Sequence, residues 1–149
     1  MSGMTREAVE AALEAGGELA RELLGNVLYM KEELPNVDLP AELLSRVEGL
    51  CESLIGLKHD TLSELTEVAE AFESGGNVTA AQERLARIEA WMGSELRRIG
   101  PVVGALDGAS LAKPDCRLAY VLVAESMANV LTSFQQFRTA VAGIPPRAI

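Results

Sequence analysis

Three features of the sequence predict an all-α protein that folds as an antiparallel up-down-up-down four-helix bundle with long helices. Apolar residues recur at alternating three- and four-residue intervals through four long segments, as on one face of an α-helix. Prolines and glycines separate the segments, so consecutive helices are expected to be antiparallel neighbours. The length of 149 residues suits one domain, so we expect residues 1–149 to form a single bundle. An α-solenoid is the alternative, but no period of about 34 residues repeats.

The first predicted helix covers roughly residues 5–34. Thr5 is its expected N-cap, and Pro35 ends it. Glycines such as Gly16 and Gly25 cost up to about 1 kcal/mol each relative to alanine in a helix interior, so we expect a neighbouring helix to pack closely there. The buried row has heptad spacing: Val9, Leu13, Gly16, Ala20, Leu23, Val27, Met30 and Leu34.

The second predicted helix covers roughly residues 39–74. It has Pro40 in its first turn and ends at Gly75 and Gly76, where a glycine adopts the left-handed conformation that closes a helix. Its apolar row drifts by one position near Gly56, as expected for a nearly straight helix. The row consists of Leu43, Val47, Leu50, Leu54, Ile55, Leu62, Leu65, Ala69 and Phe72.

The third predicted helix covers roughly residues 79–106. Thr79 and Gln82 have the spacing of a capping box, which predicts the N-terminus. Pro101 removes a helical hydrogen bond and clashes one turn back, so we expect a kink or break there, and a loop from residue 107 to Lys113. The apolar row is Ala81, Leu85, Ile88, Met92, Leu96, Ile99, Val103 and Leu106.

The fourth predicted helix covers roughly residues 114–143, with Pro114 at its first position. Residues 144–149 contain two prolines and are expected to form a loose tail. The helix has one clean apolar row and a second one beside it. The first is Tyr120, Val123, Met127, Val130, Phe134, Phe137, Val141 and Ile144, and the second is Leu118, Val121, Leu122 and Leu131.

The composition limits the partners and the compartment. With 13 Lys and Arg against 22 Asp and Glu, the net charge of −9 argues against nucleic acid as a partner. Residues 1–12 lack the pattern of a secretory signal, so we expect a cytoplasmic protein. The apolar run Leu118–Ala124 is too short for a membrane span. Cys51 and Cys116 are therefore expected to be reduced thiols.

The sequence lacks the residue patterns of common enzymes and cofactor sites. No phosphate-binding loop, dinucleotide-binding loop or nucleophile elbow occurs. A carboxylate di-metal site in a bundle needs a glutamate three residues before a histidine, and Gly56 occupies that place before His59. Glu95 and Glu125 lie at or beside apolar rows, where two inward carboxylates would bind a cation or raise each other's pKa. The alternative, which is commoner, is that glutamates at the edge of an apolar stripe reach solvent. We predict a protein that is not an enzyme and has no metal or cofactor.

One short stretch suggests signalling chemistry instead. His59, the single histidine, is followed by Asp60 in the middle of a long predicted helix. The stretch from Leu57 to Leu65 resembles the phospho-accepting box of sensor histidine kinases, although Leu62-Ser63-Glu64 replaces the family's usual Arg-Thr-Pro run. The resemblance implies that His59 is the phosphoryl acceptor and that Asp60 orients it. The alternative is an ordinary surface histidine.

Charge is distributed unevenly along the chain. Residues 1–75 contain 16 acids and 5 bases, whereas the remainder contains 6 acids and 8 bases. Within the first segment, Glu10, Glu14, Glu18 and Glu22 form a row of acids at four-residue spacing. Like charges four residues apart weaken a helix, so the charge of this row needs compensation. Either the third helix supplies it, through Arg84, Arg87, Arg97 and Arg98, or a basic protein partner does. We predict a helical interaction or adaptor module with an acidic row formed by Glu10, Glu14, Glu18 and Glu22.

Two further predictions concern surfaces and cavities. The apolar face of the fourth helix is wider than one stripe, which predicts a homodimer with Val121 and Leu122 in the interface. The other possibility is a small apolar ligand in the bundle core, held in gaps beside glycines. Those glycines are Gly25, Gly49, Gly56 and Gly93.

Overall fold

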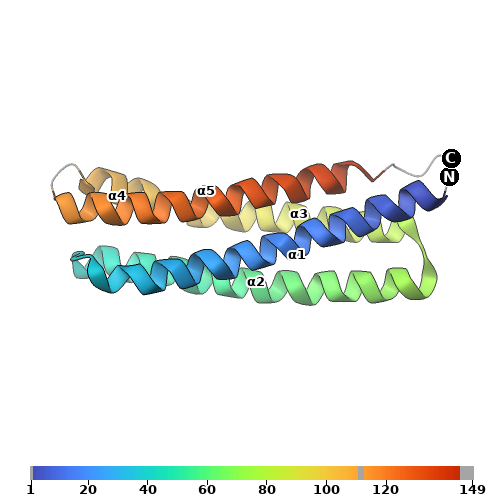
Figure 1. Cartoon of the computed structure of the whole chain (residues 1–149), viewed down its shortest axis with the longest axis horizontal. Helices are drawn as coiled ribbons and strands as arrows, with labels where there is room; N and C mark the ends of the chain where they lie inside the picture. Colours follow the sequence, from blue (N-terminus) through green and yellow to red (C-terminus); the bar gives the residue numbers. More distant parts are fainter. Residues whose placement is uncertain (1, 111–112, 145–149) are drawn as a thin grey trace.

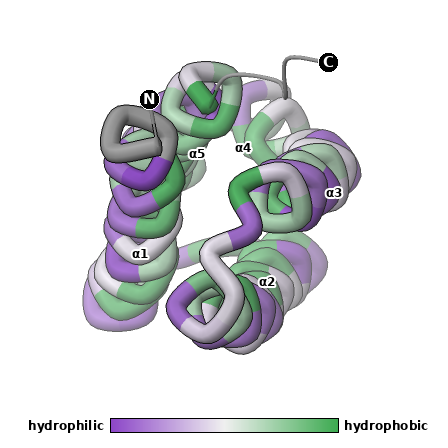
Figure 2. Tube along the Cα trace, turned by 90° about the vertical axis from the view of Figure 1, so that its right-hand side faces the viewer, coloured by the Kyte–Doolittle hydropathy of each residue, from purple (hydrophilic) through white to green (hydrophobic). Residues whose placement is uncertain are grey.

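The computed structural model describes residues 2–110 and 113–144, and they form the predicted up-down-up-down bundle. Four long helical rods lie side by side, and each runs antiparallel to the next along the chain (Figure 1). Viewed from one end, the rods surround a core with their hydrophobic sides turned inward (Figure 2). Helix α1 packs against α2 and α5, and α2 also packs against α3. Helices α1 and α3 therefore lie diagonally across the bundle.

Helix α1 spans Ser2–Glu33 and leads into a short 3-10 turn, η1, at Leu34–Asn36. Its predicted heptad row faces the core. Thr5 lies inside the helix, so the prediction that it is the N-cap was wrong. The three residues before Thr5 contain no proline and do not oblige a helix to stop, which is why the helix begins earlier than expected.

Helix α2 spans Ala41–Gly75 and returns along α1. Pro40 immediately precedes it, where a missing N–H costs no helical hydrogen bond. Gly76 has a φ of 61°, and its N–H donates to the carbonyl of Phe72 at 2.7 Å. The left-handed glycine predicted at this turn is thereby confirmed.

Helices α3 and α4 form the third rod and span Val78–Ile99 and Pro101–Ser110. The rod bends by 23° near Pro101, which confirms the predicted kink. The helix begins with Asn77 as its N-cap, since the Asn77 Oδ1 accepts a hydrogen bond from the Ala80 N–H at 3.0 Å. Thr79 is already the second helical residue, so the predicted capping box was wrong.

Helix α4 also continues four residues beyond the predicted boundary at residue 106, where a loop was expected. Leu106 is fully buried, and the half-buried Val102, Val103 and Ala109 pack against the core. Helix α4 lies against α5. Tertiary packing of these side chains therefore outweighs the low helix propensity of Gly104 and Gly108.

Helix α5 spans Pro114–Ala142, with the proline in its first turn as predicted. Its first predicted row is buried apart from the half-buried Tyr120. Ile144, which was assigned to a loose tail, is instead buried against the core. Residues 145–149 of that predicted tail lie outside the described part of the chain.

Helices α2 and α5 both pack closely against α1 at Gly16. A Cβ atom there would lie 2.7 Å from the Cδ1 of Leu65 on α2 and 3.2 Å from the Cε1 of Phe137 on α5. The close packing predicted for this glycine is confirmed. Gly25 differs, because nothing outside its own helix lies within 4 Å of a Cβ at that position.

A polar contact joins α1 and α5 about three turns farther along α1. The Asn129 Nδ2 donates to the Oδ1 of the buried Asn26 at 3.1 Å. The Asn26 Nδ2 donates in turn to the carbonyl and the carboxylate of Glu22, at 2.7 and 2.9 Å. Since a shift of either helix breaks this chain of bonds, it favours one register of α1 on α5.

Candidate interaction surfaces

His59 and Asp60 lie on the exposed outer part of α2. No hydrogen bond or ion pair joins the two side chains within the described residues. Asp60 instead lines an open groove toward α3, which His59 does not line. The structure thus gives Asp60 no contact that would orient His59, and the phosphotransfer interpretation stays a prediction.

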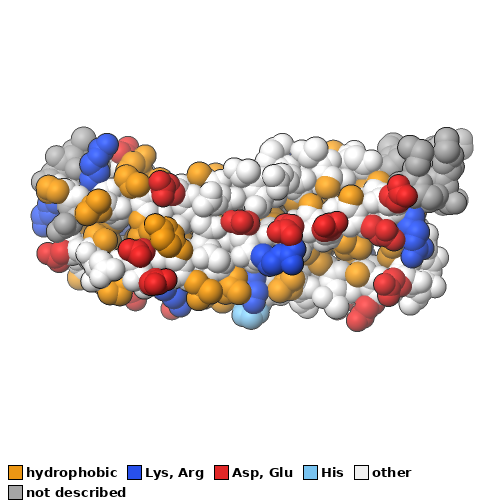
Figure 3. Space-filling view, viewed as in Figure 1, with side chains coloured by type: hydrophobic (Ala, Val, Ile, Leu, Met, Phe, Trp, Pro, Cys, Tyr) orange, Lys and Arg blue, Asp and Glu red, His pale blue; other side chains and the backbone are white. Residues whose placement is uncertain are grey.

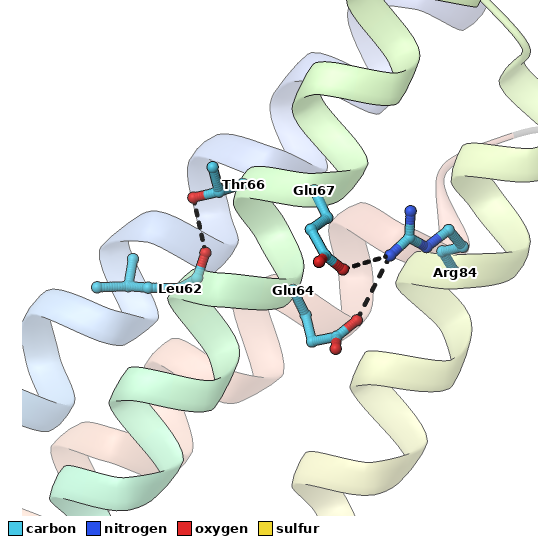
Figure 4. Close-up of polar contacts among 5 residues, drawn as sticks. All are labelled: Leu62, Glu64, Thr66, Glu67 and Arg84. Atoms are coloured by element: carbon cyan, nitrogen blue, oxygen red, sulfur yellow. Dashed lines mark hydrogen bonds and ion pairs between the residues drawn. The ribbon is translucent and has the colours of Figure 1, made fainter.

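The groove between α2 and α3 is bridged by one arginine. Arg84 of α3 reaches across to two glutamates of α2, with its Nη2 3.1 Å from Glu67 and 3.6 Å from Glu64 (Figure 4). On the outer side of α2, the Thr66 hydroxyl donates to the carbonyl of Leu62 at 2.8 Å (Figure 4). These ion pairs link α2 and α3, so the charge of Arg84 is neutralised within the bundle.

The arginines of α3 do not neutralise the acidic row on α1. Arg84 contacts α2, and the Arg98 Nη2 pairs with Glu95 of its own helix at 2.8 Å. Arg87 and Arg97 form no ion pair with the row in the described structure. The predicted compensation from the third helix was therefore wrong, because α3 lies diagonally opposite α1.

The acidic row itself lies on the outer face of α1. Glu10, Glu14 and Glu18 are exposed and Glu22 is half-buried. Arg6 pairs with Glu10 at 3.1 Å, and Arg21 pairs with Glu18. No ion pair of Glu14 occurs within the described residues. The row is thus only partly neutralised, by arginines one turn away on the same helix.

The face centred on α1 has two distinct parts (Figure 3). Acidic side chains follow α1 over its N-terminal half, and hydrophobic side chains gather toward the end of the molecule where α1 stops. Large exposed hydrophobic residues at this end of α1 are Leu28 and Tyr29. Neither residue belongs to the apolar rows predicted from the sequence, because neither lies at a core-facing heptad position of α1.

The second apolar row of α5 is partly exposed and partly buried. Leu118, Val121 and Leu131 are 60%, 42% and 48% exposed, whereas Leu122 is only 7% exposed. Leu122 therefore belongs to the core of its own chain and offers no surface to a second copy. Of the two residues predicted for a dimer interface, Val121 alone is accessible.

Both cysteines are free and buried, as expected for reduced thiols. Burial raises the pKa of the Cys51 thiol, Lys31 opposes this shift, and Glu48 and Glu52 add to it. A thiol held protonated in this way is a poor nucleophile. Cys116 is buried in the first turn of α5, where its sulfur packs as a small apolar group.

The glycines proposed to leave space in the core do not do so. Gly25, Gly49 and Gly56 are exposed, and a Cβ on any of them would meet nothing within 4 Å. Gly93 is buried, but the Phe134 ring lies 3.3 Å from the position of a Cβ there. The argument for a core ligand beside these four glycines is therefore wrong.

Residues 2–110 and 113–144 contain no cluster of three or more His, Cys, Asp or Glu side chains that suits a metal ion. None of the helices in this part combines the length and apolar character needed to cross a membrane. The chain matches no protein-family model, no curated protein and no solved structure. Its function must therefore be inferred from its surfaces.

Proposed function

We propose that this chain is a non-enzymatic cytoplasmic interaction module whose acidic α1 face recruits a basic protein partner. The proposal depends on the acidic row on the outer face of α1, whose charge is only partly neutralised by arginines. The row consists of Glu10, Glu14, Glu18 and Glu22. Exposed ion pairs within one helix contribute only about 0.3–0.5 kcal/mol each to stability. Basic groups of a partner therefore readily replace Arg6 and Arg21 as the partners of these glutamates.

Charge reversal tests this surface. We expect Glu14→Lys/Glu18→Lys to weaken binding of a labelled, helical alanine–lysine peptide about tenfold at low salt, because two charges change sign and the local charge becomes more positive by four units. Affinity for the wild-type chain is expected to fall as NaCl rises. Fluorescence anisotropy measures both effects.

The matched control is Glu70→Lys/Glu73→Lys, which changes the net charge equally at exposed positions of α2. Its effect on the peptide affinity is expected to be clearly smaller. Equal losses from the two double variants would show that net charge alone acts, and would remove the α1 row from the mechanism.

We further propose that the module self-associates through the start of α5. Leu118 and Val121 lie one turn apart and are exposed there, next to the basic Arg117. Residues 76–149 have a slight excess of basic over acidic groups, so two copies meet at this helix without the repulsion expected between two α1 faces.

Light scattering at micromolar concentration tests the dimer. The wild-type chain is expected to have twice its 15.9 kDa monomer mass, and Val121→Glu is expected to give the monomer, because a buried carboxylate at a two-fold interface is costly. Gln135→Glu adds the same charge at an exposed position farther along α5 and is the control. A wild-type mass that stays at 15.9 kDa on concentrating would contradict the proposal.

A further inference from the structure

Helix α4 is attached to the bundle less firmly than α3, which precedes it in the same rod. Among the described side chains of α4, Leu106 alone is buried, whereas α3 buries seven residues. Helix α3 is also tied by ion pairs to both of its neighbours, through Arg84 to α2 and through Glu89 to α5. Removing α4 from its place therefore exposes much less apolar surface than removing α3.

The sequence of α4 adds to this weakness. Pro101 has no N–H, so the first residue of α4 donates no hydrogen bond back to α3. Gly104 and Gly108 lie within its ten residues, and a Cβ at either position would meet nothing within 4 Å. No close packing therefore requires glycine at these two positions. A helix of this length with two interior glycines is marginal unless tertiary contacts support it.

Helix α4 covers a buried thiol on α5. Cys116 lies 18 residues, or five helical turns, before Phe134, so both residues lie on the same face of α5. Phe134 faces the third rod, because its ring lies 3.3 Å from the position of a Cβ on Gly93. Beside the first half of α5 the third rod consists of α4 (Figure 1). The cover over Cys116 is therefore α4.

The other buried thiol has a different cover. Cys51 lies about four helical turns before Leu65 on α2, and Leu65 faces Gly16 of α1. Cys51 is thus covered by α1, the 32-residue helix that packs along α2. Both thiols are free and only 1% exposed. Their accessibility therefore reports the opening of two different helices.

We infer that α4 is a lid that opens while the four long helices α1, α2, α3 and α5 stay folded. Because α4 contacts both α2 and α5, its opening gives solvent and apolar ligands access to the core between them. The row uncovered on α5 is apolar and has helical spacing. It consists of Cys116, Tyr120, Val123 and Met127.

Maleimide labelling of the two native cysteines in the full chain tests the lid. A buried thiol reacts only when its cover opens, so its labelling rate follows the population of the open form. We expect Cys116 to react at least about tenfold faster than Cys51, as measured by mass spectrometry of the labelled peptides. Gly104→Ala/Gly108→Ala is expected to slow the labelling of Cys116 about tenfold, because alanine favours the helical, closed form of α4.

The matched control is Gly49→Ala/Gly56→Ala, which makes the same change at two exposed glycines of α2. It is expected to slow the labelling of Cys51 and to leave that of Cys116 unchanged, because the lid opens with α2 intact. Equal slowing of Cys116 by the two double variants would mean that only unfolding of the whole chain exposes this thiol. A Cys116 rate that Gly104→Ala/Gly108→Ala does not change would mean that fraying of α5 exposes it. Either result would overturn the lid, as would a Cys116 rate no higher than that of Cys51.

Discussion

Replacing Phe137 by alanine is expected to lower the free energy of unfolding by about 3–5 kcal/mol, the usual cost of removing a buried phenylalanine ring. Phe137 is fully buried, and its ring lies opposite Gly16, where α1 packs closely against α2 and α5. The missing ring leaves a cavity that neither α1 nor Leu65 can fill without moving a whole helix. Urea denaturation followed by circular dichroism measures the loss.

Leu131→Ala on the same helix serves as the control for that experiment. Leu131 is exposed and lies away from the proposed dimer contact, so its truncation removes little buried area and is expected to change the free energy of unfolding by no more than about 0.5 kcal/mol. Similar losses from the two variants would mean that the face of α5 around Phe137 is not docked in the core. They would therefore contradict the packing of α5 on α1.

The four-helix architecture could be predicted because each rod has a long row with helical period. The row from Val123 to Val141 on α5 is buried, and so is most of the heptad on α1. Prolines and glycines marked the turns, and Gly76 takes the conformation that its place after a long helix predicts. These are local properties, and packing in the bundle reinforces them rather than overriding them.

The sequence indicated a wide apolar face on α5, but it could not show which part of that face the chain buries in its own core. Helix α5 packs against α1 on one side and α4 on the other, so a second set of residues is buried as well. Cys116, Ala119, Leu122 and Ser126 belong to this set. Three of them are small or polar and carry little signal in an apolar pattern, which explains why Leu122 was assigned to the surface.

The ion-pair partners of the arginines could not be predicted from the sequence, because they depend on which helices are neighbours in the bundle. In an up-down-up-down bundle the third rod lies next to the second and fourth, and diagonally across from the first. Arg84 therefore meets Glu64 and Glu67 of α2, and Arg138 of α5 pairs with Glu89 of α3 at 2.7 Å. Sequence spacing alone describes contacts within a helix and leaves contacts between rods undetermined.

Glycines inside α1 and α2 leave room for a large gain in stability. Gly17, Gly25, Gly49 and Gly56 lie inside α1 and α2, and a Cβ at each would meet nothing within 4 Å. Alanine is favoured over glycine by about 0.5–1 kcal/mol at such positions, mainly because the unfolded chain has less conformational freedom to lose. Replacing all four by alanine is therefore expected to raise the free energy of unfolding by about 2–4 kcal/mol and the melting temperature by roughly 5–15 °C.

Gly16→Ala provides the sharpest comparison, because it makes the same change one residue before Gly17. The helix propensity gained is the same, but the new methyl group would lie 2.7 Å from the Leu65 Cδ1 within a packed core. Leu65 is buried, so its side chain must shift within the core to admit the methyl group, and we expect a net loss of about 1–3 kcal/mol from overpacking. Thermal melts of the two single variants should shift in opposite directions. A stabilised Gly16→Ala variant would show that α1, α2 and α5 do not converge at this glycine.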